Sequence, residues 1–81
     1  MPYYTYILIS LSDGGYYYGH SSALEKRLQT HNAGKVRSTK SRRPFELHYY
    51  EVFQTKSEAY RMELLFKSAA GKVYLKSKNI I

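Results

Sequence analysis

The chain has no cysteine, few acidic residues and no long hydrophobic run. Without cysteine, neither a disulfide nor a thiolate metal site can stabilise the fold, which fits a reducing compartment. No stretch approaches the roughly 20 apolar residues of a membrane span, and the N-terminus lacks the basic start and apolar run of a signal peptide. We therefore expect one cytoplasmic domain, residues 1–81, with a modest core and no membrane contact.

Basic residues dominate the charged side chains. Thirteen Lys and Arg residues face six Asp and Glu residues, which gives a net charge of +7 and a pI near 9.7. Net charge indicates partners rather than fold, and a small chain this basic favours a polyanion such as nucleic acid. An anionic membrane surface is the competing partner, but no helix here combines a basic face with a free apolar face.

Hydrophobic periodicity predicts an α+β fold with a small antiparallel three-stranded sheet flanked by helices. The expected order is strand–strand–helix–strand–helix–helix, at residues 3–11, 16–20, 22–33, 45–54, 57–70 and 72–78. Two capping boxes, at Ser22 with Glu25 and at Thr55 with Glu58, should start the first two helices. Two glycines, Gly34 and Gly71, should end them.

Packing faces follow from the same periodicities. In the third strand we expect Leu47, Tyr49 and Glu51 on one face, because side chains alternate along a strand. The core face of the second helix should consist of Ala59, Met62, Leu65 and Phe66. These expectations fix which side chains should be buried and which should remain free for function.

The first two strands are rich in tyrosine. Asp13-Gly14 between apolar runs is a strong hairpin signal. A two-residue turn there would place Tyr17 opposite Ser10, so that Tyr17 shares a face with Tyr6. Tyrosine is also a good strand former that fills half-wet cores, so packing alone is an open interpretation of this pattern.

Three polar side chains on the predicted helices are candidates for phosphodiester chemistry. Arg27 and His31 lie at i and i+4 on one helix face, where Arg27 could clamp a phosphate and His31 could orient or protonate a reacting group. Glu63 could supply one carboxylate to Mg²⁺. The simpler alternatives are a solvated helix face for the first pair and an ion pair of Glu63 with Lys67.

A basic loop at residues 35–44 holds five cations and no acid. Pro44 disfavours regular structure just before it. We expect the loop to hold a phosphate backbone without reading base sequence. The nucleic-acid-binding candidates are His20 and the five loop cations Lys35, Arg37, Lys40, Arg42 and Arg43.

Tyr4-Thr5-Tyr6, Tyr17-Tyr18-Gly19, Arg27, His31 and Glu63, in this order, resemble the motifs of the GIY-YIG nuclease superfamily, and most closely its small stand-alone bacterial members. The resemblance covers essentially the whole chain. It implies divalent-metal-dependent cleavage of a DNA phosphodiester, with one Mg²⁺ or Mn²⁺ ion. We expect DNA, including branched or flapped DNA, as the partner, and no small-molecule cofactor.

The resemblance also implies the role of each site residue. Tyr6 or Tyr17 would deprotonate the attacking water, and Arg27 would stabilise charge on the phosphate. His31 would assist at the site, and Glu63 would bind the metal. We expect these five side chains to converge on one surface cleft. A Glu63 on the opposite side of the sheet from Tyr17 and Arg27 would contradict the nuclease interpretation.

Several positions depart from the family pattern. Tyr4 replaces the glycine of the first motif, Tyr18 is bulkier than the usual aliphatic residue, and His20 stands where several members carry lysine. No separate DNA-binding domain is present in this sequence, so little sequence specificity is expected. Two alternatives therefore remain: a nucleic-acid-binding module with weak or no activity, and a protein-interaction domain with an acidic target.

Overall fold

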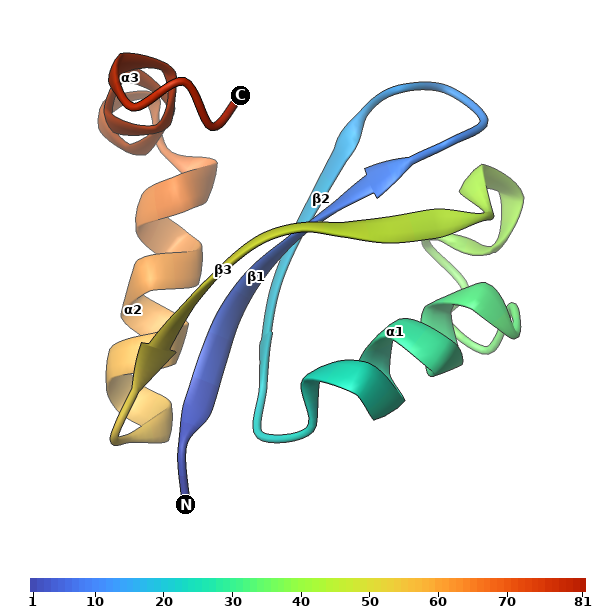
Figure 1. The fold of residues 1–81 in the computed structure, drawn as a ribbon, viewed down its shortest axis with the longest axis horizontal. Helices are drawn as coiled ribbons and strands as arrows, with labels where there is room; N and C mark the ends of the chain where they lie inside the picture. The colour runs from blue at the N-terminus through green and yellow to red at the C-terminus, as the bar shows by residue number, and fades with distance from the viewer.

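The computed structural model describes all 81 residues as a three-stranded antiparallel sheet with helices on both faces (Figure 1). The strand order is β2-β1-β3, so β1 is central and β2 and β3 are edge strands. The elements are β1 Tyr3–Ser10, β2 Tyr16–Ser21, α1 Leu24–Asn32, a 3₁₀ turn η1 Lys40–Arg42, β3 Phe45–Phe53, α2 Lys56–Lys67 and α3 Ala69–Ser77. This confirms the predicted fold class and element order. No helix has the length and apolar character to cross a membrane.

The alternation of side chains along β1 builds two small cores. Tyr6 and Leu8 pack with Phe45 under α1, whereas Ile7 packs with Phe66 under α2 and α3. All five side chains are 3% exposed or less. Figure 1 shows the consequence, with α1 on one side of the sheet and the α2–α3 pair on the other.

The β1–β2 hairpin has a longer loop than predicted. Tyr17 pairs with Leu8 rather than with Ser10, and the loop runs from Leu11 to Gly15. The Ser10 hydroxyl accepts the Asp13 amide at 3.2 Å, and the Asp13 carboxylate accepts the Gly15 amide at 2.7 Å. Two backbone bonds also close the loop, from the Ser10 amide to the Gly15 carbonyl and from the Gly14 amide to the Ser10 carbonyl, each at 2.8 Å. The shift in register is two residues, an even number, so Tyr17 keeps the predicted face.

The start of α1 was wrongly predicted. Strand β2 continues to Ser21, and the N-cap of α1 is Ala23, which makes no side-chain capping bond. The Ser21 hydroxyl instead accepts the Ala23 amide at 3.0 Å. The capping box at Ser22 therefore does not form. At the other end, Gly34 follows the helix with φ = 77°, as expected of a C-terminal stop.

A bulge in β3 separates residues that were expected to share a face. Leu8 pairs with Leu47 and Ile7 with Tyr49, so His48 is an extra residue in the ladder. Leu47 therefore faces α1, while Tyr49 packs against Phe66 on the opposite face. The expectation that Leu47, Tyr49 and Glu51 lie together is wrong for Leu47.

In the second half of the chain, α2 ends and α3 begins three residues earlier than predicted. Thr55 and Glu58 form the predicted capping box of α2. However, α2 ends at Lys67, and Gly71 lies buried inside α3 rather than closing α2. A Cβ at Gly71 would clash with the Leu65 carbonyl, so glycine allows the two helices to approach closely there. Leu65 itself is 41% exposed, so the prediction that it belongs to the core face of α2 is wrong.

Candidate active site at the free edge of the sheet

Tyr6 is the central side chain of the predicted site. It lies on β1, is 1% exposed, and pairs with Gly19 on the edge strand β2. The Tyr6 hydroxyl occupies the space into which a Cβ at position 19 would project. Because Gly19 has no side chain, the phenol can extend across β2 toward the free edge of the sheet.

His31 joins Tyr6 to the loop that follows α1. Its Nε2 atom lies 3.3 Å from the Tyr6 hydroxyl, and its Nδ1 atom lies 2.9 Å from the Thr39 hydroxyl. The ring is fully buried. Burial, and then the nearby Arg27 charge, lower the pKa of His31 to about 4. His31 is therefore neutral at pH 7, which favours the predicted orienting role over the protonating one.

Arg27 and Tyr17 complete the cluster on the α1 side. Burial raises the pKa of Tyr6 above its usual value, while hydrogen bonding and charge from Arg27 act in the opposite direction. The Tyr17 ring lies 4.8 Å from the His31 ring, centroid to centroid. Arg27 also lines an open hollow beside Thr30 of the same helix. The face of α1 that Arg27 and His31 share is thus directed toward Tyr6 and is not a fully solvated helix face.

Glu63 enters from α2 and is only 9% exposed. The His20 Nδ1 atom lies 2.7 Å from one carboxylate oxygen, and the Lys67 ammonium lies 2.8 Å from the other. Burial alone would raise the pKa of Glu63, but the hydrogen bonds from Lys67 and His20 lower it overall. The carboxylate is therefore ionised at neutral pH, with a protein donor on each oxygen.

Glu63 does not share a layer with Arg27. Helix α2 packs against the opposite face of the sheet from α1, so the expectation that Glu63 lies on the same side of the sheet as Tyr17 and Arg27 is wrong. The two layers nevertheless interact across β2. Glu63 affects the pKa of Tyr6, and Tyr17 affects the pKa of Lys67. The cluster straddles an edge strand, where side chains from both layers can reach the same free edge.

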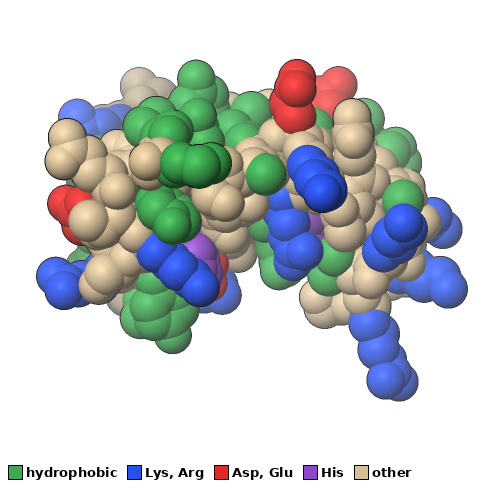
Figure 2. Space-filling view, turned by 90° about the horizontal axis from the view of Figure 1, so that it is seen from below, with side chains coloured by type: hydrophobic (Ala, Val, Ile, Leu, Met, Phe, Trp, Pro, Cys, Tyr) green, Lys and Arg blue, Asp and Glu red, His purple; other side chains and the backbone are tan.

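The metal-binding potential of this cluster rests on one carboxylate. No three His, Cys, Asp or Glu side chains in the protein come together as a metal-binding group. Glu63 with His20 beside it is the one carboxylate–imidazole pair in direct contact. Figure 2 shows histidine and Lys or Arg side chains around the hollow between the two lobes of the molecule.

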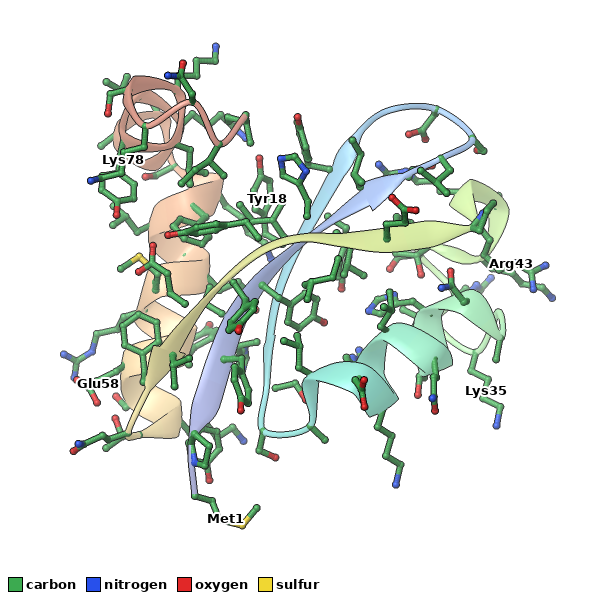
Figure 3. The ribbon with its side chains drawn as sticks, in the orientation of Figure 1. Met1, Tyr18, Lys35, Arg43, Glu58 and Lys78 are labelled. Atoms are coloured by element: carbon green, nitrogen blue, oxygen red, sulfur yellow. The ribbon has the colours of Figure 1, made fainter.

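The basic loop divides into free and engaged cations. Lys35, Arg37 and Lys40 are exposed, and Arg43 is exposed although its Nε atom donates to the Lys40 carbonyl at 2.9 Å. Lys35 and Arg43 project from the same end of the molecule (Figure 3). These side chains are available to a polyanion. His20, the remaining predicted contact, is instead held by Glu63.

Arg42 has a structural role within the protein. Its Nε atom lies 2.8 Å from the Asp13 carboxylate, and its guanidinium lies 5.6 Å from the Phe45 ring centroid. Hydrogen bonding from Arg42 lowers the pKa of Asp13 to about 2. The ion pair joins the basic loop to the hairpin loop. Arg42 was predicted to be a phosphate contact, but it is not free for that role.

Sequence reasoning missed Thr39. This side chain is fully buried in the middle of the basic loop, and it holds His31. In the sequence, Thr39 is a short polar residue between exposed cations. Threonine is common at such positions in solvated loops, so the sequence does not indicate that this side chain is buried. Lys67 was recognised as a partner of Glu63. Because the carboxylate is buried, removing Lys67 should cost more stability than breaking a surface ion pair.

The chain is similar to known proteins over most of its length. Residues 2–79 match the family model described as the GIY-YIG catalytic domain. The chain is 48% identical over 67 residues to a UPF0213 protein of Bacillus pumilus, which covers 82% of this chain and 67% of that protein. It is 43% identical over 75 residues to a UPF0213 protein of Staphylococcus haemolyticus, covering 91% and 90% of the two chains.

A solved structure has the same arrangement of elements. The solution NMR structure of a UPF0213 protein from Bacillus halodurans is 36% identical and superimposes with a TM-score of 0.55. The match covers 95% of this chain and 84% of the other. The similarity therefore includes every strand and helix that contributes to the cluster around Tyr6.

Proposed function

Because the chain belongs to the GIY-YIG family of nucleases, we propose that it is an endonuclease that hydrolyses DNA phosphodiester bonds with little sequence specificity. The observation that carries the proposal is the environment of the Tyr6 hydroxyl. His31 Nε2 lies 3.3 Å from it, and the Arg27 charge and the buried Glu63 carboxylate both act on its pKa. A phenol, a guanidinium and a carboxylate at one edge are the groups that a phosphodiester hydrolase needs.

In the proposed mechanism Arg27 binds the scissile phosphate. A guanidinium fork matches two phosphate oxygens and offsets the charge that develops as water attacks. The same cation acts to lower the pKa of Tyr6. Tyr6 therefore lies where an attacking water bound next to the phosphate can give up its proton. Tyr17, whose ring packs against His31, would line the approach of the substrate.

We propose that Glu63 holds one Mg²⁺ or Mn²⁺ ion. The residues present fit such an ion, because magnesium often takes one or two protein carboxylates and completes its shell with water and phosphate oxygens. When bound, the ion would offset negative charge on the phosphate. His20 and Lys67 keep Glu63 ionised, yet they also occupy its oxygens, so an ion must displace at least one of them.

The exposed cations of the basic loop would hold the DNA backbone. Lys35, Arg37, Lys40 and Arg43 carry no acidic partner, unlike Arg42. Phosphate contacts of this kind position DNA without reading its bases. The loop is attached to the site through Thr39 and His31, so DNA bound there would lie next to Tyr6.

A nicking assay with Mg²⁺ or Mn²⁺ on plain, branched and flapped DNA tests this function. The key variant is Glu63→Gln, which keeps the shape of the side chain but removes its charge. The matched control is Glu46→Gln, which removes one exposed carboxylate from β3. Cleavage should collapse in the first variant and persist in the second, with DNA binding retained in both. Equal cleavage by Glu63→Gln and the parent would contradict the metal assignment.

A nucleic-acid-binding module without useful activity is the second candidate. One observation favours it: both oxygens of Glu63 are already satisfied by protein donors. Under this alternative the parent protein binds DNA with a strong salt dependence but cuts none of the three substrates in either metal. An acidic protein target, the third possibility, would bind in a way that DNA fails to compete with.

A further inference from the structure

The His31 ring connects the Thr39 hydroxyl to the Tyr6 hydroxyl through its two nitrogen atoms. The Thr39 hydroxyl has a single proton, which it donates to the Val36 carbonyl at 3.3 Å. If its oxygen accepts from His31 Nδ1, 2.9 Å away, both contacts of the hydroxyl are hydrogen bonds, whereas the reverse direction leaves the Val36 carbonyl without the Thr39 proton. A neutral imidazole has one N–H, so the proton sits on Nδ1 and Nε2 is left as an acceptor.

The Tyr6 hydroxyl then donates to His31 Nε2 at 3.3 Å. With its own proton directed inward, the Tyr6 oxygen presents only lone pairs to the free edge of the sheet. Arg27 acts to lower the pKa of the same hydroxyl. Tyr17 makes no hydrogen bond through its hydroxyl within the protein, so nothing comparable orients it.

We propose that Thr39 is a positioning residue that fixes the Nδ1–H tautomer of His31, and that Tyr6 rather than Tyr17 thereby becomes the base that accepts a proton from water. The role of Tyr6 as the base rests on the proposed nuclease function. The tautomer itself is a property of the free protein and can be measured without any substrate.

The proton transfer balances as follows. When the Tyr6 oxygen takes a proton from the attacking water, the proton that it already carries passes to His31 Nε2. The water oxygen bonds to phosphorus, the bond from phosphorus to the leaving sugar oxygen breaks, and that oxygen takes a proton from solvent. His31 later returns its extra proton to solvent.

A bound phosphate would make this transfer easier. The lowered pKa of His31 has two causes, burial first and the Arg27 charge second. A phosphate held by Arg27 offsets the second cause. The imidazole is thus unprotonated in the free protein and becomes a better acceptor when the substrate is in place.

Replacement of Thr39 by valine should reverse the tautomer. Valine keeps the β-branched shape but leaves His31 Nδ1–H buried without an acceptor, which costs about 1–3 kcal/mol. The alternative tautomer avoids this cost, because Nε2–H can donate to the Tyr6 oxygen. That bond takes a lone pair of Tyr6, and the phenol proton must then point elsewhere.

The test uses ¹⁵N NMR of the histidine rings together with DNA cleavage. The parent and Thr39→Ser, which retains the hydroxyl, should show His31 protonated at Nδ1. Thr39→Val should move the proton toward Nε2 and lower kcat by at least about tenfold with little change in KM. The matched control is Thr5→Val: Thr5 is equally buried on the opposite face and donates to the Ala59 carbonyl at 2.7 Å.

Thr5→Val should lower stability without changing the His31 spectrum or kcat. A parent protein with its His31 proton on Nε2 would overturn the inference. So would a Thr39→Val variant that keeps the Nδ1 proton, or one whose kcat matches that of Thr5→Val. If the parent cuts no DNA at all, the proposed function fails, while the tautomers of the three variants still decide the role of Thr39.

Discussion

The Tyr6 hydroxyl lies where a Cβ at position 19 would project, so the central phenol of the site depends on a glycine in the neighbouring strand. Gly19→Ala should force the Tyr6 ring away from His31. We expect cleavage to fall by at least about tenfold and stability to fall by roughly 1–3 kcal/mol through overpacking. Chemical denaturation and a nicking assay measure the two effects.

The control for this substitution is Gly15→Ala. A Cβ at position 15 approaches the tip of Arg42 and the Asp13 carboxylate, side-chain atoms that can move, rather than a buried ring. Gly15→Ala should therefore leave cleavage close to that of the parent. Full activity in Gly19→Ala would show that the Tyr6 position is not needed for the reaction.

Lys67 should weaken metal binding in the absence of DNA. Its ammonium lies 2.8 Å from one of the two Glu63 oxygens, and its charge repels a divalent cation. Lys67→Met should therefore bind Mn²⁺ about fivefold more tightly, which corresponds to removing roughly 1 kcal/mol of repulsion. Electron paramagnetic resonance of free Mn²⁺ measures the affinity.

Lys76→Met is the matched control for metal binding, because it removes an exposed cation from α3. Its Mn²⁺ affinity should equal that of the parent. Weaker or unchanged binding in Lys67→Met would mean that the ion does not use the oxygen held by Lys67.

Burial of His31 should make the protein sensitive to mild acid. The pKa of His31 falls from 6.5 to about 4 on folding, so the unfolded chain binds more protons between these values. Stability should therefore decrease as the pH falls from about 6.5 to about 4, by roughly 3 kcal/mol from this residue. Glu63 loses its contribution at still lower pH, because its pKa is lowered from 4.5.

Urea unfolding at a series of pH values measures this dependence. His31→Gln should flatten the curve between pH 6.5 and pH 4, whereas His48→Gln, at an exposed position, should not. If both variants retain the slope of the parent, the acid sensitivity comes from another group.

The free and engaged cations of the basic loop should differ in their effect on DNA binding. Replacing Lys35, Arg37 and Lys40 by glutamine should reduce the log–log salt slope by about 3, if each contacts one phosphate. Arg42→Gln should instead lower the melting temperature, because it breaks the ion pair with Asp13. Fluorescence anisotropy at several salt concentrations measures the slope. An unchanged slope in the triple variant would mean that the loop is a solvated surface.

The faces of the two tyrosine strands could be predicted because the side-chain period of a strand is two residues. The register of Tyr17 was wrong by two positions, yet the face was right, since an even shift preserves alternation. Local signals also sufficed for the capping box of Thr55 and Glu58, whose four residues contain both partners.

Other features depend on contacts between distant segments and carry no local signal. The bulge at His48 arises from pairing with β1, and the close approach at Gly71 arises from packing against α2. The engagement of Arg42 by Asp13 and the burial of Thr39 against His31 likewise join residues far apart in the chain. A cation in a loop and a threonine in a loop look the same in the sequence whether they are free or held.

The position of the cluster at the free edge of β2 determines how a polymer can approach it. No strand continues the sheet beyond β2, so no further strand covers that edge. Under the proposed function, a long DNA strand could be laid against this edge sideways, at any point along its length, without threading an end. An edge site is thus suited to internal bonds and to junctions, where no terminus is close at hand.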